Sequence, residues 1–181
     1  MPASASGDRS RARRIFTPEP ERQGLARGAR LAGARMASTD FRRADLGETD
    51  LRGSNTKWAN FTGANLASAD LRNADLFHAT FDDASLAGAD ARSANLFGAN
   101  LINAKAAGAD FSGAYLKDVL MEGIDLSGGS IRDCHALFNG ANLEAADFTD
   151  ADLWDSNFAN VRNLDDSVRA ALAEPCVVRR R

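Results

Sequence analysis

Hydrophobic residues recur along this chain with a fixed period of five. From Leu31 to Ile131, every fifth position carries a hydrophobic side chain, with Thr56 as the exception. The period then slips by two positions, resumes at Phe138 and continues to Phe158. These positions, called centres below, number 21 before the slip and 5 after it. Repetition at a fixed period is typical of solenoids, in which each unit is stabilised by its neighbours.

The residues around each centre are also patterned. A small side chain stands two positions before most centres, as at Ala64 and Ala74, and Asp or Asn stands one position before, as at Asn65 and Asp75. A period of five matches neither the 3.6 of a helix nor the 2 of a strand. A chain that turns a corner in every pentad does fit, with two side chains inward and three outward. Asp and Asn are favoured in turns because they bond to nearby backbone groups.

Four such corners close a coil of about 20 residues, and coils stack at the usual strand spacing of about 4.8 Å. The 26 pentads therefore predict about 6.5 coils. Residues that stand four pentads apart should lie above one another. We expect an internal column, called the core ladder, made of Phe41, Phe61, Phe81, Leu101 and Met121.

The motif Ala-(Asp/Asn)-Leu-X-X occurs at Ala64-Asn65-Leu66, Ala74-Asp75-Leu76 and Ala151-Asp152-Leu153. It resembles the signature of the pentapeptide-repeat family, and the resemblance covers residues 31–161. It implies an all-β fold, a right-handed quadrilateral β-helix. The family includes quinolone-resistance-type members that present an acidic rod to DNA gyrase in place of DNA.

Three regions are predicted. Residues 1–30 form a flexible basic extension, residues 31–161 form the solenoid, and residues 162–181 form a C-terminal helix and basic tail. The helix is expected at 163–173, where Asp165 and Asp166 suit the positive end of the helix dipole and Pro175 follows. This helix caps the last coil, or alternatively the C-terminal region forms a homodimer.

Composition argues against several classes of protein. The chain has no apolar run long enough for a membrane span and no secretory signal, so we expect a cytoplasmic protein. Cys134 and Cys176 match neither a disulfide framework nor a zinc motif. Only two histidines are present, His78 and His135, and no base–nucleophile pairing or glycine-rich phosphate loop stands out. We therefore expect no enzyme activity, catalytic residues, metal, cofactor or small-molecule substrate.

One group of outward positions is aromatic where polar residues are usual. Clustered exposed aromatic side chains often mark an interface. We expect this surface to contact another protein or a second copy of the chain. Cover by Ile15 and Phe16 of the extension is the alternative. The candidate interface, called the aromatic surface below, consists of Trp58, Phe77, His78, Phe97 and Tyr115.

Charge is unevenly distributed. Residues 31–161 contain 19 acidic and 10 basic residues, whereas residues 1–30 contain seven arginines and three acids. The acids either mimic DNA or reflect only the Asp of the repeat consensus. The sequence thus predicts a non-catalytic scaffold for protein–protein interaction. The alternatives are a DNA-mimicking modulator that protects DNA gyrase or a related topoisomerase from inhibitors, and nucleic-acid contact through the arginine-rich tails.

Overall fold

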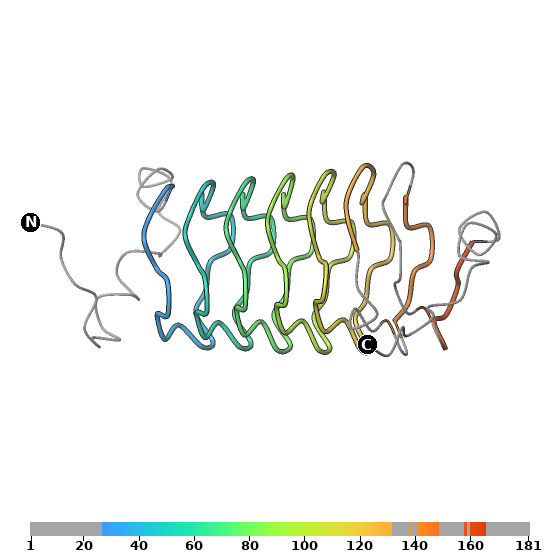
Figure 1. Cartoon of the computed structure of the whole chain (residues 1–181), viewed down its shortest axis with the longest axis horizontal. Helices are drawn as coiled ribbons and strands as arrows, with labels where there is room; N and C mark the ends of the chain where they lie inside the picture. Colours follow the sequence, from blue (N-terminus) through green and yellow to red (C-terminus); the bar gives the residue numbers. More distant parts are fainter. Residues whose placement is uncertain (1–26, 132–137, 139–140, 149–157, 159, 166–181) are drawn as a thin grey trace, which may run out of the picture.

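The chain forms an elongated stack of coils (Figure 1). The computed structural model describes residues 27–131, 138, 141–148, 158 and 160–165. Within these residues there is no helix and no extended strand, and coils are joined by isolated parallel bridges. The predicted all-β solenoid is therefore confirmed.

Each pentad turns at the two residues that follow its centre. The N–H of Ala64 donates to the carbonyl of Phe61 across the turn, at 2.8 Å, and the same bond joins Ala44 to Phe41 at 3.0 Å. The residue two positions after the centre has a positive φ, 64° at Gly63. Type II turns require this conformation at their third residue, which favours glycine and asparagine there. The turn thus follows each centre, and the Asp or Asn of the repeat stands directly before the centre.

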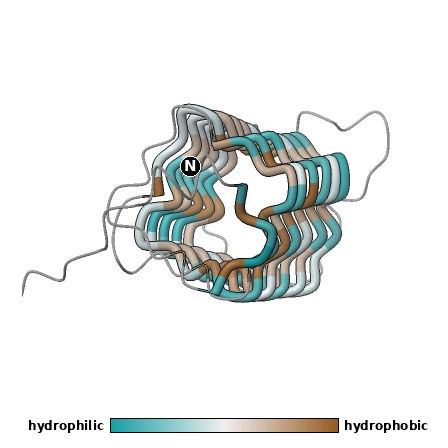
Figure 2. The backbone as a smooth tube through the Cα atoms, turned by 90° about the vertical axis from the view of Figure 1, so that its right-hand side faces the viewer, coloured by the Kyte–Doolittle hydropathy of each residue, from teal (hydrophilic) through white to brown (hydrophobic). Residues whose placement is uncertain are grey.

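Successive coils pair through the residue before each centre. Asp50 bridges Asp70 and Asp70 bridges Asp90, so each bridge joins positions four pentads apart. Viewed along the long axis, the coils lie one behind another (Figure 2). Among the described residues, coil-to-coil bonding is present from Gly28 onwards, whose N–H donates to the carbonyl of Gly47 at 2.8 Å. It therefore includes the end of the segment that the sequence assigned to the extension.

The slip in the period is visible in the bridges. Leu120 pairs with Asn142, which is two positions further along the chain than four pentads would give. Asn142 pairs with Arg162, which restores the regular spacing of four pentads. The chain thus absorbs the additional residues within one coil and then returns to its regular coil length. Residues 132–137, which include Cys134 and His135, lie outside the described part.

The interior is filled by the centres and by the small residues two positions before them. Phe41 and Phe61 stack with ring centroids 4.8 Å apart, and Phe61 and Phe81 stack at 4.7 Å. Leu101 and Met121 follow in the same column and are fully buried. Thus every member of the core ladder is inside.

Other predictions fall on residues outside the described part. These include residues 1–26, most of the helix expected at 163–173, and Cys176. The coil count of about 6.5 and the right-handed sense stay predictions. No helix in the described residues has the length and hydrophobicity needed to cross a membrane.

A candidate interaction surface on one side of the solenoid

In many pentads the Asp or Asn before the centre bonds to the backbone of the turn that follows. Asp50 Oδ1 accepts the N–H of Arg52 at 3.2 Å, and Asn65 Oδ1 accepts the N–H of Ala67 at 3.1 Å. This bond from a side chain to the backbone two residues later is an Asx turn. It explains why Asp and Asn recur, and it means that most such acids have a structural role.

The aromatic surface lies on the pentads centred on Thr56, Leu76, Leu96 and Leu116. Trp58 is 55% exposed and Tyr115 is 37% exposed. They are the exposed large hydrophobic side chains of the described residues. Both belong to this one surface, so apolar exposure is concentrated there.

The aromatic rings of this surface form a contiguous group. Phe77 and Phe97 stack with centroids 5.4 Å apart and planes 8° apart. Trp58 packs its ring at 81° to Phe77, with centroids 5.6 Å apart, and Tyr115 lies 5.8 Å from Phe97. The structure therefore brings together side chains from successive coils that are far apart in the sequence.

His78 is fitted against the two phenylalanines. Its ring centroid is 4.4 Å from that of Phe77 and 5.7 Å from that of Phe97. Its Nδ1 lies 3.1 Å from the carbonyl oxygen of Gly98, which requires the proton on Nδ1. A Cβ at residue 98 would collide with His78 Cε1, so the imidazole occupies space that only glycine leaves free.

Two lysines end the row of stacked rings. Lys57 Nζ is 5.9 Å from the ring centroid of Phe77, and Lys117 Nζ is 5.7 Å from that of Phe97. These distances are within the range of cation–π attraction. Lys57 also pairs with Asp75 at 3.0 Å. The rings therefore lie between two positive charges.

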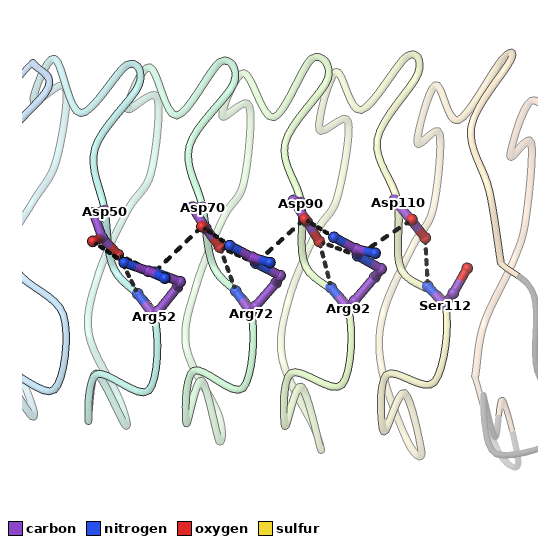
Figure 3. Close-up of polar contacts among 8 residues, drawn as sticks. All are labelled: Asp50, Arg52, Asp70, Arg72, Asp90, Arg92, Asp110 and Ser112. Atoms are coloured by element: carbon purple, nitrogen blue, oxygen red, sulfur yellow. Dashed lines mark hydrogen bonds and ion pairs between the residues drawn. The ribbon is translucent and has the colours of Figure 1, made fainter.

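The neighbouring side of the solenoid carries a ladder of alternating charges (Figure 3). Arg52 Nη2 is 2.7 Å from Asp50, and its Nε is 3.4 Å from Asp70 in the next coil. Arg72 and Arg92 repeat this arrangement. We call this set the Asp–Arg ladder: Asp50, Arg52, Asp70, Arg72, Asp90, Arg92 and Asp110.

Three aspartates of the ladder have lowered pKa values. The hydrogen bonds from Arg52 lower the pKa of Asp50 to about 2, and equivalent bonds lower the pKa values of Asp70 and Asp90. Asp82, on another side, has the opposite shift because burial raises its pKa. The ladder face is thus a compensated ionic surface.

Sequence reasoning missed the ladder, although a signal for it was present. Asp-Leu-Arg begins at Asp50 and again at Asp70, and Asp-Ala-Arg begins at Asp90, so the motif recurs once per coil. That spacing places each arginine beside the aspartate of the following coil.

Residues 27–131 of the rod are less acidic than the total for residues 31–161 suggests. Over residues 27–131 there are 13 acidic and 11 basic residues, so this part of the rod is nearly neutral. Of the excess of nine acidic residues over residues 31–161, four belong to residues 31–131 and five to residues 132–161. This part of the chain therefore does not present an acidic surface along its length.

The described residues offer little for metal chemistry. Among them, no group of three His, Cys, Asp or Glu side chains is arranged to hold a metal ion. The surface instead combines exposed rings, two lysines and one imidazole, and these groups suit non-covalent binding.

A family model for pentapeptide repeats matches the chain in eight copies, over residues 26–55, 57–90, 94–133 and 134–162. The chain belongs to the pentapeptide-repeat family. This confirms the resemblance seen in the motif, and it indicates no enzymatic family. A search of curated proteins gave no significant match.

Several solved structures resemble this pentapeptide-repeat protein. One is a pentapeptide-repeat protein from the thylakoid lumen of Arabidopsis thaliana, with 35% identity, coverage of 61% of this chain and 74% of that chain, and a TM-score of 0.43. Another is QnrB1, a plasmid-mediated fluoroquinolone resistance protein, with 23% identity, coverage of 83% and 91%, and a TM-score of 0.41. HetL from the cyanobacterium Nostoc, involved in heterocyst differentiation regulation, has 27% identity, coverage of 74% and 84%, and a TM-score of 0.20.

Proposed function

We propose that this protein is a non-catalytic scaffold that binds another protein through its aromatic surface. The observation that supports this most directly is the exposure of Trp58 and Tyr115, both on the aromatic surface. Exposed aromatic side chains in a contiguous group are characteristic of binding energy hot spots. In this solenoid the core is filled by the inward positions, so the outward rings are not needed to build it.

Trp58 and His78 both stand two positions after a centre, with φ values of 54° and 51°. Every pentad of residues 27–131 has a positive φ at this position, so the repeat imposes the conformation. What distinguishes these two residues is the ring that each presents beside the turn.

The test is a pull-down from extracts of the source organism with three baits. These are the native chain, a Trp58→Ser/Tyr115→Ser variant, and Asp83→Ser as the matched control. Asp83 lies at the same turn position as Trp58, with a φ of 57°, but on another side. We expect the native and control baits to retain a common partner that the double variant loses. If all three retain the same proteins, or the native bait retains none, the proposal fails.

The DNA-mimic function remains the alternative proposal, and one observation favours a particular face for it. Asp82 accepts hydrogen bonds from Asn100 and Ile102, and Glu122 accepts one from Asn142, so neutral groups rather than arginines contact these acids. Within the described part of the chain neither acid forms an ion pair, unlike the acids of the Asp–Arg ladder. Such a surface can attract a basic DNA-binding saddle.

A gyrase supercoiling assay with a fluoroquinolone present tests this alternative. Protection by the native chain that is lost in an Asp82→Asn/Glu122→Gln variant would support it. A Phe77→Ala/Phe97→Ala variant should protect as well as the native chain, since the mimic surface lies elsewhere. No effect at a large excess over gyrase would remove the DNA-mimic proposal.

Nucleic-acid contact through the arginine-rich tails concerns residues outside the described part, and deletion of residues 1–30 tests it.

A further inference from the structure

Two rings of the aromatic surface belong to a straight row with one residue from each of four successive coils. Lys57, Phe77, Phe97 and Lys117 each follow a centre directly and are spaced by one coil. The two rings stack at 5.4 Å in the middle, and each lysine ammonium lies over the outer ring nearest to it. A partner lying along the solenoid axis would therefore meet a positive charge, two rings and a second positive charge.

The backbone carbonyls of all four residues in this row already accept hydrogen bonds from the neighbouring coil. The N–H groups of Trp58, His78 and Gly98 donate to the carbonyls of Phe77, Phe97 and Lys117, each at 2.9 Å. A partner strand therefore finds no open edge here for β-augmentation. A segment that satisfies its own backbone groups does not need one, and an α-helix is such a segment.

The spacing of the row also fits a helix. Successive coils are about 4.8 Å apart, so the four residues lie at about 0, 4.8, 9.6 and 14.4 Å. Helix positions i, i+3, i+7 and i+10 lie on one stripe at about 0, 4.5, 10.5 and 15 Å along the axis. Same-face residues of a strand lie about 6.8 Å apart and fall out of step with the coils. A helix can thus place one side chain over each coil.

The charged residues on this side of the solenoid also restrict which partner can bind. The described pentads on this side carry Arg35, Lys57 and Lys117 against Asp75 and Asp118, a net charge of +1 in a chain whose total is −3. Acidic side chains at the two ends of the stripe would face the two lysines. Since Lys57 already pairs with Asp75, the acid facing Lys117 should contribute more to affinity.

We propose that the aromatic surface binds an amphipathic α-helix of a partner protein, with apolar residues at i+3 and i+7 and acidic residues at i and i+10. Trp58 lies on one side of the row beside Lys57, and Tyr115 precedes Leu116 on the other side. They flank the helix at opposite ends. This inference rests on the proposed function and specifies the chemistry of the partner.

The test selects binders from a random library of peptides long enough for five helical turns, displayed on phage, with the full chain as target. Enriched peptides are synthesised, and their binding and helicity are measured by fluorescence anisotropy and circular dichroism. We expect acidic residues ten positions apart around an apolar stripe, and helix formation on binding. Lys117→Glu should weaken binding at least tenfold. Lys105→Glu, an exposed lysine on another side, should leave it unchanged.

The outcomes separate this inference from the proposed function. Peptides that require Phe77 and Phe97 but are proline-rich, extended or basic at their ends would overturn the helix and leave the binding surface intact. Equal binding to the native chain and Lys117→Glu would likewise overturn the charge assignment. If no enriched peptide depends on Phe77 or Phe97, the helix inference fails. The three-bait pull-down then decides separately whether the surface binds a protein at all.

Discussion

At the scale of single residues, the position two after each centre determines both the turn and the surface. Gly63, Asn73 and Ser93 occupy it elsewhere in the solenoid with the same positive φ as Trp58 and His78. The repeat therefore imposes the conformation, and the side chain at this position determines what the surface presents to a partner. Gly98 is a special case, because its lack of a Cβ allows His78 to lie against the turn.

Replacing Gly98 by alanine tests this arrangement. Its φ of 61° costs alanine about 1 kcal/mol, and the new Cβ also displaces the His78 imidazole. Gly88→Ala is the matched control, since its φ is 64° and its Cβ would meet only Ser68 Oγ, at 3.8 Å. We expect both variants to lose about 1 kcal/mol in urea unfolding. Only Gly98→Ala should also shift the NMR signals of the His78 ring. An unchanged ring in both variants would contradict the assigned packing.

At the scale of a coil and its neighbours, side-chain columns add to the backbone ladder. The stacked phenylalanines fill the interior, and the Asp–Arg ladder joins coils on the outside. Exposed ion pairs contribute little singly, but a connected series shares its partners. Each arginine of the ladder contacts two carboxylates, so it ties one coil to the next.

The internal column predicts a large effect of truncation. Phe61 is fully buried between Phe41 and Phe81, and Phe61→Ala would leave a cavity that the regular coils cannot close. We expect a loss of about 3–5 kcal/mol in chemical unfolding. Thr62→Ala, at the next residue on the surface, should change stability by less than about 0.5 kcal/mol. Similar losses in the two variants would argue against this column as a main source of stability.

The ladder predicts a dependence of stability on pH. The pKa of Asp50 is about 2 in the folded chain, below its ordinary value of about 3.9, so the folded state binds fewer protons than the unfolded state in this range. The stabilisation by Arg52 is therefore complete above about pH 4 and is lost as the pH falls towards 2. We expect the difference in Tm between the native chain and Arg52→Gln to shrink over that window.

Thermal unfolding at low salt from pH 2 to 7 checks this expectation. Arg43→Gln serves as the control, because Arg43 forms no ion pair with a described residue. Its difference from the native chain should not vary with pH, and added salt should reduce only the effect of Arg52→Gln. A difference for Arg52→Gln that is constant across the whole range would show that its carboxylate contacts do not stabilise the fold.

An unusually large part of the fold could be predicted from the sequence because the repeat is local and periodic. The period of five predicts which side chains face inward, and the coil of four pentads predicts that Phe77 lies beside Phe97. The pairing of Arg52 with Asp70 was harder to see, since it depends on side-chain reach across a coil as well as on register. The fit of His78 over Gly98 could not be predicted, because it requires the local turn geometry and the choice of a rotamer.

At the scale of the whole molecule, the coil of four pentads is the unit that must be preserved. Deleting residues 79–98 removes one whole coil, joins His78 to Ala99 and keeps every later residue on its own side. Arg72 then faces Asp110 in the next coil, and Phe61 lies above Leu101. Deleting only residues 79–88 keeps the period of five but moves the following chain by half a coil. Arg72 then faces Asn100, and Phe61 lies above Ala91.

The smaller deletion should therefore be the more damaging one. In a solenoid, removing a whole coil costs one set of neighbour contacts and leaves the remaining interfaces native. The half-coil deletion leaves a mismatched interface in which Arg72 has lost its carboxylate partner in the next coil and a cavity lies beside Phe61. We expect Tm, followed by circular dichroism, to fall further for the half-coil deletion than for the whole-coil one. An equal or smaller fall would mean that pentads are interchangeable and that the columns do not hold the coils in register.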